Sequence, residues 1–111
     1  RLRRYPPFAD LFSFTVTGAD ESRVIRAAKA LRDALGYAVE RREELKPLSI
    51  EVLGPAGASV VKVNNRYRYR VFLVGKGCPA LRRLVAEYLY AFYQHKENRG
   101  LDIFADCNAI Q

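Results

Sequence analysis

Apolar and polar residues alternate along several short segments of the chain, which is the pattern of half-buried β-strands. The clearest segments are 11–17 (LFSFTVT) and 66–74 (RYRYRVFLV), and shorter ones follow at 48–53, 59–63 and 101–106. The first segment places phenylalanine and valine on one side and serine and threonine on the other, so one side of this strand is expected to be buried.

Turn residues separate these segments and decide how they connect. Gly54 to Gly57 (GPAG) interrupts the second strand, which is expected to resume at Ser59 to Val63. The next two residues, Asn64 and Asn65, tolerate the positive φ of a tight turn. A hairpin is therefore predicted between the resumed second strand and the third.

Two other segments repeat apolar residues at helical spacing. Asp20 can cap a first helix, predicted from Glu21 to Leu35 and ended by Gly36. A second helix has apolar residues at i, i+3, i+4, i+7, i+8 and i+11 between Leu81 and Phe92.

The predicted order is β-α-β-β-α-β, so the fold class is α+β. We expect a split βαβ, ferredoxin-like arrangement, in which an antiparallel four-stranded sheet carries two helices on one face and leaves the other open. Residues 1–9, stiffened by Pro6 and Pro7, are predicted to be an entry linker, and 10–111 a single α+β domain.

The arginines and tyrosines of the segment 66–74 must take opposite faces of their strand. Burying unpaired guanidinium groups costs several kcal/mol each, so we expect Arg68 and Arg70 to point outward together with Phe72 and Val74. Tyr69, Val71 and Leu73 are then expected in the core, while the position of Tyr67 nearer the hairpin leaves its environment open.

The formal net charge of +7 comes from one part of the chain. No acidic residue occurs between Glu51 and Glu87, and the remaining 12 basic and 12 acidic residues cancel. The seven basic residues of this segment are Lys62, Arg66, Arg68, Arg70, Lys76, Arg82 and Arg83. Such a local positive field attracts polyanions or acidic peptides, and the alternative is a solvated basic face with cross-strand pairs, for example to Glu51.

Several kinds of chemistry require residue patterns that this sequence does not contain. There is no GxxxxGK[ST] loop for nucleotide triphosphates, and His95 with Cys78 and Cys107 cannot form a zinc site. We expect the two thiols to be buried and reduced, although the sequence also permits a disulfide. Asp102 and Asp106 share a strand face and are expected to be solvated or salt-bridged rather than to hold a metal.

The sequence also leads to expectations about where the protein is located and about whether the chain is a piece of a longer one. No long apolar run or signal peptide is present, so we expect a cytoplasmic protein without a membrane partner. The chain has no methionine and begins at Arg1, so we expect it to be a piece of a longer polypeptide.

An RNA-recognition module has the same element order and stacks bases on sheet aromatics. Its third strand begins with a basic residue and a glycine, whereas the segment 66–74 has no glycine and leaves only Phe72 and Phe104 as outward aromatics. Binding of RNA is therefore a third reading, after DNA binding and protein interaction.

Four motifs together resemble a known family. YPPF at 5–8, VLGP at 52–55, KVNNRYRYRVFLVGKG at 62–77 and DCNA at 106–109 resemble, in order and spacing, the C-terminal domain of primosomal protein N′, the PriA-type replication restart helicase. The resemblance covers nearly the whole chain.

This resemblance implies a bacterial, ATP-dependent 3′–5′ DNA helicase whose full-length form uses magnesium and zinc, with a noncatalytic fragment here that has no cofactor of its own. It implies a DNA-binding fold like that of a small-subunit ribosomal protein. The partners it implies are forked, branched or single-stranded DNA, other primosome proteins, and the acidic tail of single-stranded-DNA-binding protein.

The function predicted from these observations is phosphate binding on branched DNA during primosome assembly. The predicted DNA-binding residues are Lys62, Arg66, Arg68, Arg70 and Lys76, and the residues predicted to meet an acidic partner are Arg82 and Arg83. The alternative is an interaction module that docks helicase lobes or the acidic tail without affinity for DNA.

Overall fold

The computed structural model describes residues 10–109 of the 111-residue chain, and the entry linker predicted at 1–9 lies outside this range. The elements, in chain order, are β1 (Asp10–Gly18), α1 (Glu21–Arg41), η2 (Lys46–Leu48), β2 (Glu51–Val63), β3 (Arg66–Gly75), α2 (Pro79–Phe92), η3 (Lys96–Asn98) and β4 (Asp102–Ala109). No helix in residues 10–109 is both long and apolar enough to cross a membrane.

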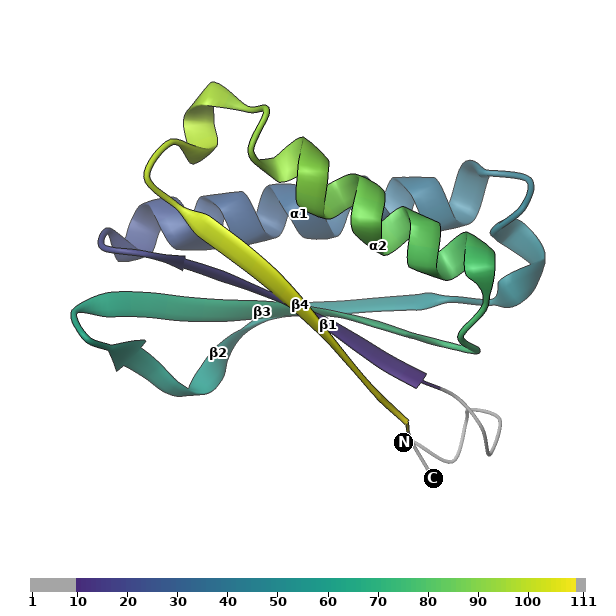
Figure 1. Cartoon of the computed structure of the whole chain (residues 1–111), viewed down its shortest axis with the longest axis horizontal. Helices are drawn as coiled ribbons and strands as arrows, with labels where there is room; N and C mark the ends of the chain where they lie inside the picture. The colour runs from purple at the N-terminus through teal and green to yellow at the C-terminus, as the bar shows by residue number, and fades with distance from the viewer. Residues whose placement is uncertain (1–9, 110–111) are drawn as a thin grey trace.

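The strands form one four-stranded antiparallel sheet in the order β2-β3-β1-β4. Both long helices lie over the same face of this sheet, as Figure 1 shows. The predicted α+β fold with two helices on one face of an antiparallel sheet is confirmed.

The core lies between the helices and the covered face of the sheet. Phe14, Val16, Val71 and Leu73 are fully buried there, as the alternation in the sequence predicts. The sheet contributes these side chains, and the helices contribute the facing apolar stripe. The opposite face, called the open face below, consists of the odd-numbered residues 11–17 of β1 and the even-numbered residues 66–74 of β3 and 102–108 of β4.

Helix α1 begins where the sequence predicts and ends later. The Asp20 side chain accepts hydrogen bonds from the Ser22 hydroxyl (2.8 Å) and from the backbone N–H groups of Arg23 (3.3 Å) and Ser22 (3.0 Å). These hydrogen bonds lower the pKa of the carboxyl group, the one from the hydroxyl most. The predicted end at Gly36 is wrong. Ala38 and Val39 continue the buried stripe beyond this glycine, so packing outweighs its low helix propensity.

Strand β2 ends at Val63 as predicted but differs from the prediction at its start and in its middle. It begins at Glu51 rather than Leu48, because Pro47 lies in the short turn η2. The predicted interruption at GPAG is a pair of register shifts within one strand, between Leu53 and Ala56 and between Gly57 and Lys62. Arg32 of α1 donates a hydrogen bond to the carbonyl oxygen of Gly54 at 2.8 Å and so joins the helix to this irregular part of β2.

The hairpin tip is confirmed. Asn64 and Asn65 have φ values of 53° and 63°, the left-handed conformation of a two-residue turn. Because β2 and β3 meet at this turn, the register that positions the arginines of β3 is set locally.

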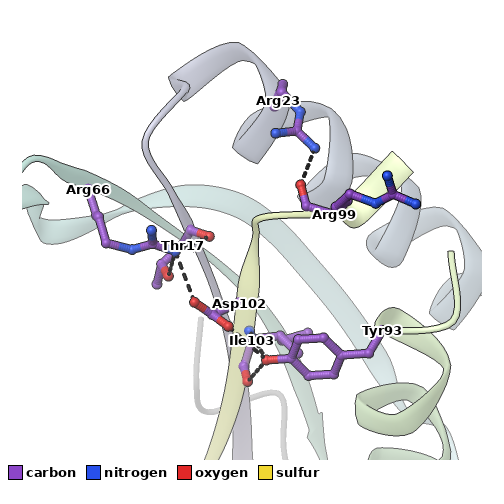
Figure 2. A network of polar contacts seen from close by, with 7 residues as sticks. All are labelled: Thr17, Arg23, Arg66, Tyr93, Arg99, Asp102 and Ile103. Atoms are coloured by element: carbon purple, nitrogen blue, oxygen red, sulfur yellow. Dashed lines mark hydrogen bonds and ion pairs between the residues drawn. The ribbon is translucent and has the colours of Figure 1, made fainter. Parts of the chain in front are cut away.

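Strand β4 is an edge strand and runs to Ala109, beyond the predicted end at Asp106. Ile103 donates its N–H to the Tyr93 hydroxyl at 3.0 Å, and the Ile103 carbonyl oxygen lies 3.3 Å from the same hydroxyl (Figure 2). Tyr93 follows directly after α2, so a side chain from the helical layer holds the outer edge of the sheet at this point.

Candidate nucleic-acid interface

The arginines of β3 form one row on the open face. Register pairs Arg68 with Thr17 and Arg70 with Thr15 of the neighbouring strand β1. Because directly opposed residues in an antiparallel pair point to the same side, these arginines lie on the face away from the helices, as predicted. Arg68 and Arg70 are half-buried along their stems.

Arg66 is held by a network at the hairpin end of this row (Figure 2). Its guanidinium group donates to the Thr17 side-chain oxygen (3.2 Å) and carbonyl oxygen (3.3 Å), and forms an ion pair with Asp102 at 3.0 Å. Asp102 belongs to β4, so Arg66 reaches across the end of β1. One of the predicted phosphate ligands therefore has an acidic partner within the domain.

Arg70 lies near the middle of the open face and has an incompletely satisfied guanidinium group. Its Nε atom is buried and has no hydrogen-bond partner in the described part of the chain. A buried donor without a partner costs free energy of about 1–3 kcal/mol.

Lys62 lies on the other face of the hairpin. It pairs with Tyr67, and its ammonium group lies 5.2 Å from the centre of the Tyr67 ring. Since Tyr67 shares a face with Tyr69, Lys62 does not join the row of arginines, although the sequence groups it with them.

Lys76 lies beyond the opposite end of β3 from Arg66, about 30 Å away along an extended strand. It is exposed and lies in the loop that leads to α2. The five residues predicted to bind DNA are therefore not one patch. Only the three arginines of β3 are neighbours on one face.

Arg82 and Arg83 lie in the second turn of α2, and both are exposed. No side chain caps the start of this helix. Asp10 accepts a hydrogen bond from the Gly77 N–H at 3.0 Å, close to Arg82. Arg82 therefore has a carboxylate nearby, whereas Arg83 makes no hydrogen bond or ion pair with the described residues.

The tyrosines of β3 are part of the covered side of the sheet. Tyr67 and Tyr69 pack against the core, and the Tyr69 hydroxyl donates to Glu21 at the start of α1 at 2.5 Å. This hydrogen bond raises the pKa of Tyr69. The prediction that Tyr69 packs inward rather than serving as a stacking platform is confirmed, and the environment of Tyr67 is settled in the same way.

Carboxylates occupy the far side of the open face. Asp102 and Asp106 pair with Thr17 and Ser13 of β1, so both point to this face, as predicted. Asp102 is salt-bridged, and the described residues hold no group of three or more metal-binding side chains. Glu51 of β2 pairs in register with Val74, four residues along β3 from Arg70.

The outward aromatics are also where the sequence placed them. Phe104 pairs with Thr15 and is 46% exposed, and Phe72 pairs with Ser13 and is half-buried. Val74 shares this face as predicted but is only 1% exposed. The most exposed part of the open face is therefore β4, where Asp102, Phe104, Asp106 and Asn108 are all exposed, whereas the arginines of β3 are half-buried.

The cysteines differ from expectation in one respect. Neither forms a disulfide, but Cys107 on β4 is exposed rather than buried, and Cys78 is half-buried before α2. Partial burial and the nearby Asp10 raise the pKa of the Cys107 thiol.

Sequence reasoning missed a groove on the helical side. A groove of about 310 Å³ lies between α1 and α2, and its floor is largely alanine. Its lining includes Ala27, Ala30, Ala34 and Ala91, with Tyr88 and Phe92 beside them. The repeated alanines at 27, 30 and 34 were the available signal, because small residues on a helix leave room against a neighbour.

The chain matches the family model of the primosomal protein N C-terminal domain over residues 1–108, and it belongs to this family. It is 37% identical over 81 residues to "Probable replication restart protein PriA" of Deinococcus radiodurans, covering 73% of this chain and 8% of that protein. It is 30% identical over 72 residues to replication restart protein PriA of Synechocystis, covering 65% of this chain and 8% of that one. The chain thus spans less than a tenth of these relatives.

Two solved structures share the fold. The de novo designed protein Foldit4 superposes with a TM-score of 0.63 at 14% identity, over 93% of this chain and 99% of that one. A dimeric ferredoxin-like protein from an uncultured marine organism gives 0.51 at 9% identity, over 93% of this chain and 95% of that one. At such identities the likeness concerns the fold alone.

Proposed function

We propose that this chain is the C-terminal domain of a bacterial replication restart helicase and binds forked or branched DNA through phosphate contacts while the primosome assembles. Membership of the primosomal protein family supports the cellular process. The observation that carries DNA binding is the alignment of Arg66, Arg68 and Arg70 along one strand of an open sheet face. A row of guanidinium groups matches the repeating charge of a nucleic-acid backbone.

The rest of the proposed protein would supply the chemistry. ATP-dependent 3′–5′ unwinding, with ATP, magnesium and zinc, belongs in this proposal to the nine-tenths of the relatives that this chain does not cover. The described residues offer no metal cluster of three or more ligands, so zinc would be held elsewhere. A bacterial cytoplasmic location follows from this assignment.

The test is binding of a labelled forked duplex, followed by fluorescence anisotropy at several salt concentrations. If the three arginines of β3 neutralise about three phosphates, the slope of log K against log salt is expected to lie near −2 to −3, with little dependence on the base sequence of the duplex arms. The triple variant Arg66→Ala, Arg68→Ala, Arg70→Ala should weaken binding and flatten the slope. Unchanged affinity in a folded triple variant would sink the proposal.

A second candidate is protein interaction, favoured by exposed Arg82 and Arg83 beside the uncapped start of α2. In this case an acidic, Phe-terminated peptide, as in the tail of single-stranded-DNA-binding protein, would contact these residues. A peptide titration separates the two candidates. Saturable peptide binding that is lost in Arg82→Ala, Arg83→Ala, without any binding of DNA, would favour this one.

A further inference from the structure

Three neighbouring strands give the open face three kinds of chemistry. Strand β3 contributes arginines, β1 contributes short hydroxyl side chains, and β4 contributes an aromatic ring between carboxylates. In one row across the sheet Arg70, Thr15 and Phe104 are aligned, and in the next Phe72, Ser13 and Asp106. The arginines and these carboxylates are therefore on separate strands, whose backbones lie two strand spacings or about 10 Å apart, and Arg66 reaches across to the carboxylate of Asp102 at 3.0 Å.

The middle of the open face, along β1, is recessed between two borders. The β3 border carries the arginines, and the β4 border carries Phe104 and the carboxylates. Ser13 and Thr15 are 8% and 1% exposed, since longer side chains stand on both sides of them in register. Phe104 rises on one border with nearly half of its surface exposed. An exposed phenyl ring on a sheet offers a flat apolar platform to a planar ligand.

The β3 border offers contacts for an anion in the same row as Phe104. Arg70 lies in this row and makes no hydrogen bond or ion pair with the described residues. A single nucleotide can span the distance between them, with its phosphate near the arginine and its base over the ring. In a duplex the base faces are already stacked and cannot reach such a platform.

We propose that the open face binds single-stranded DNA, with phosphates along the arginines of β3 and a base stacked on Phe104 of β4. This inference rests on the proposed function and identifies the part of a fork that the domain contacts. The segregation of charge argues for this occupant, because a phosphate backbone matches the β3 border and is repelled by the β4 border.

The β4 border also discriminates between bases. Asp106 makes no hydrogen bond or ion pair with the described residues and shares the face with Phe104, two positions away on the same strand. An ionised carboxylate only accepts hydrogen bonds, so it suits the N4 amino group of cytosine and opposes the O4 acceptor of thymine. Oligo(dC) is therefore bound more tightly than oligo(dT).

The experiment measures anisotropy of labelled oligo(dC), oligo(dT) and a blunt duplex of ~8 nucleotides or pairs, a length within the site sizes of single-strand-binding folds. Phe104→Leu keeps an apolar side chain and removes the ring. It is expected to weaken single-strand binding about fivefold or more and to leave duplex binding unchanged. Tyr90→Leu is the matched control, because Tyr90 is 71% exposed on α2 in the other layer.

A second variant tests the preference for cytosine over thymine. Asp106→Asn supplies both a donor and an acceptor, so the ratio of dC to dT affinity should fall toward one. Thermal unfolding of each variant verifies that it is folded.

Distinct results would overturn distinct claims. Parental single-strand affinity in folded Phe104→Leu, or tighter binding of the duplex than of either oligonucleotide, overturns the stacking site. Tighter binding of RNA of the same sequence overturns the choice of DNA, and a dC preference that survives in Asp106→Asn overturns the role of that carboxylate. If the parent binds no DNA of any kind, the proposed function fails instead.

Discussion

Single residues in this domain show where local preference loses to packing. Gly36 has the weakest helix propensity of any residue in α1 and yet lies inside the helix, five residues before its end. Its φ is helical, and an added Cβ would meet no atom within 4 Å. Nothing in the structure therefore requires glycine at this position.

We expect Gly36→Ala to stabilise the domain by about 0.5–1 kcal/mol, since alanine loses less backbone entropy when the helix forms. Urea unfolding of parent and variant measures the difference. Gly54→Ala is the contrasting control, because Gly54 has φ of +99° and its added Cβ would lie 2.7 Å from the Arg70 carbonyl oxygen, so it should destabilise the domain. A Gly36→Ala variant less stable than the parent would contradict the argument.

The predictable residues are those whose environment follows from alternation. Tyr69, Val71 and Phe104 take the faces that their strand positions indicate, since exchanging faces would bury arginines. The partners of Arg66 could not be predicted, because Asp102 is 36 residues away in sequence and meets it only after β4 pairs with β1. The face that Lys62 takes could have been predicted, because a two-residue turn at Asn64 and Asn65 pairs Lys62 with Tyr67 and not with an arginine.

At the scale of elements, the two long helices are joined at one end by a double hydrogen bond. Arg42, just after α1, donates to both carboxylate oxygens of Glu87 in α2 at 2.7 Å, and also lies over the Tyr88 ring. The guanidinium group lowers the pKa of Glu87, and the carboxylate raises the pKa of Arg42. Both groups are partly exposed, so the pair is a modest contribution.

Because the pKa of Glu87 is lower in the folded state, its stabilising effect is complete above the ordinary carboxyl value and is lost as the pH falls through the folded value. Glu87→Gln should therefore cost about 0.5–1 kcal/mol at neutral pH and nothing at an acidic pH low enough to protonate the carboxyl group. Urea unfolding at both pH values is the measurement. Glu40→Gln on the exposed surface of α1 is the control, and an equal cost at both pH values would rule out the ion pair as its source.

Elements were easier to predict in kind than in extent. The order of strands and helices followed from periodicity and from turn residues such as Asn64 and Asn65. The ends did not, because α1 is extended by burial of Val39, and β4 is extended by pairing with β1. Tertiary contacts decide such boundaries, although the helical spacing of Ala38 and Val39 after Leu35 was a local signal of the longer α1.

At the scale of the molecule, the chain's excess positive charge does not translate into a uniformly basic face. The acid-free part of the sequence supplies β3, but the fold places β4 with Asp102 and Asp106 on the same open face. Any polyanion on this face must therefore follow β3 and compete with Asp102 for Arg66.

We expect Asp102→Asn to raise the affinity for forked DNA by up to about fivefold at low salt, because it frees Arg66 for phosphate. The log–log salt slope should steepen by about one. Anisotropy titrations compare the variant with the parent, and Glu40→Gln removes one negative charge from the helical layer as a control. If both substitutions change the affinity equally, net charge is responsible and Arg66 is not.

The hydrogen bonds between the Tyr93 hydroxyl and the Ile103 backbone affect how the protein associates with other chains in solution. A sheet's outer strand offers its backbone N–H and C=O groups to any extended chain that it meets, which is a common route to aggregation. Tyr93 occupies both groups of Ile103 on β4. A side chain that follows α2 thereby protects this part of the edge from intermolecular strand pairing in a crowded cell.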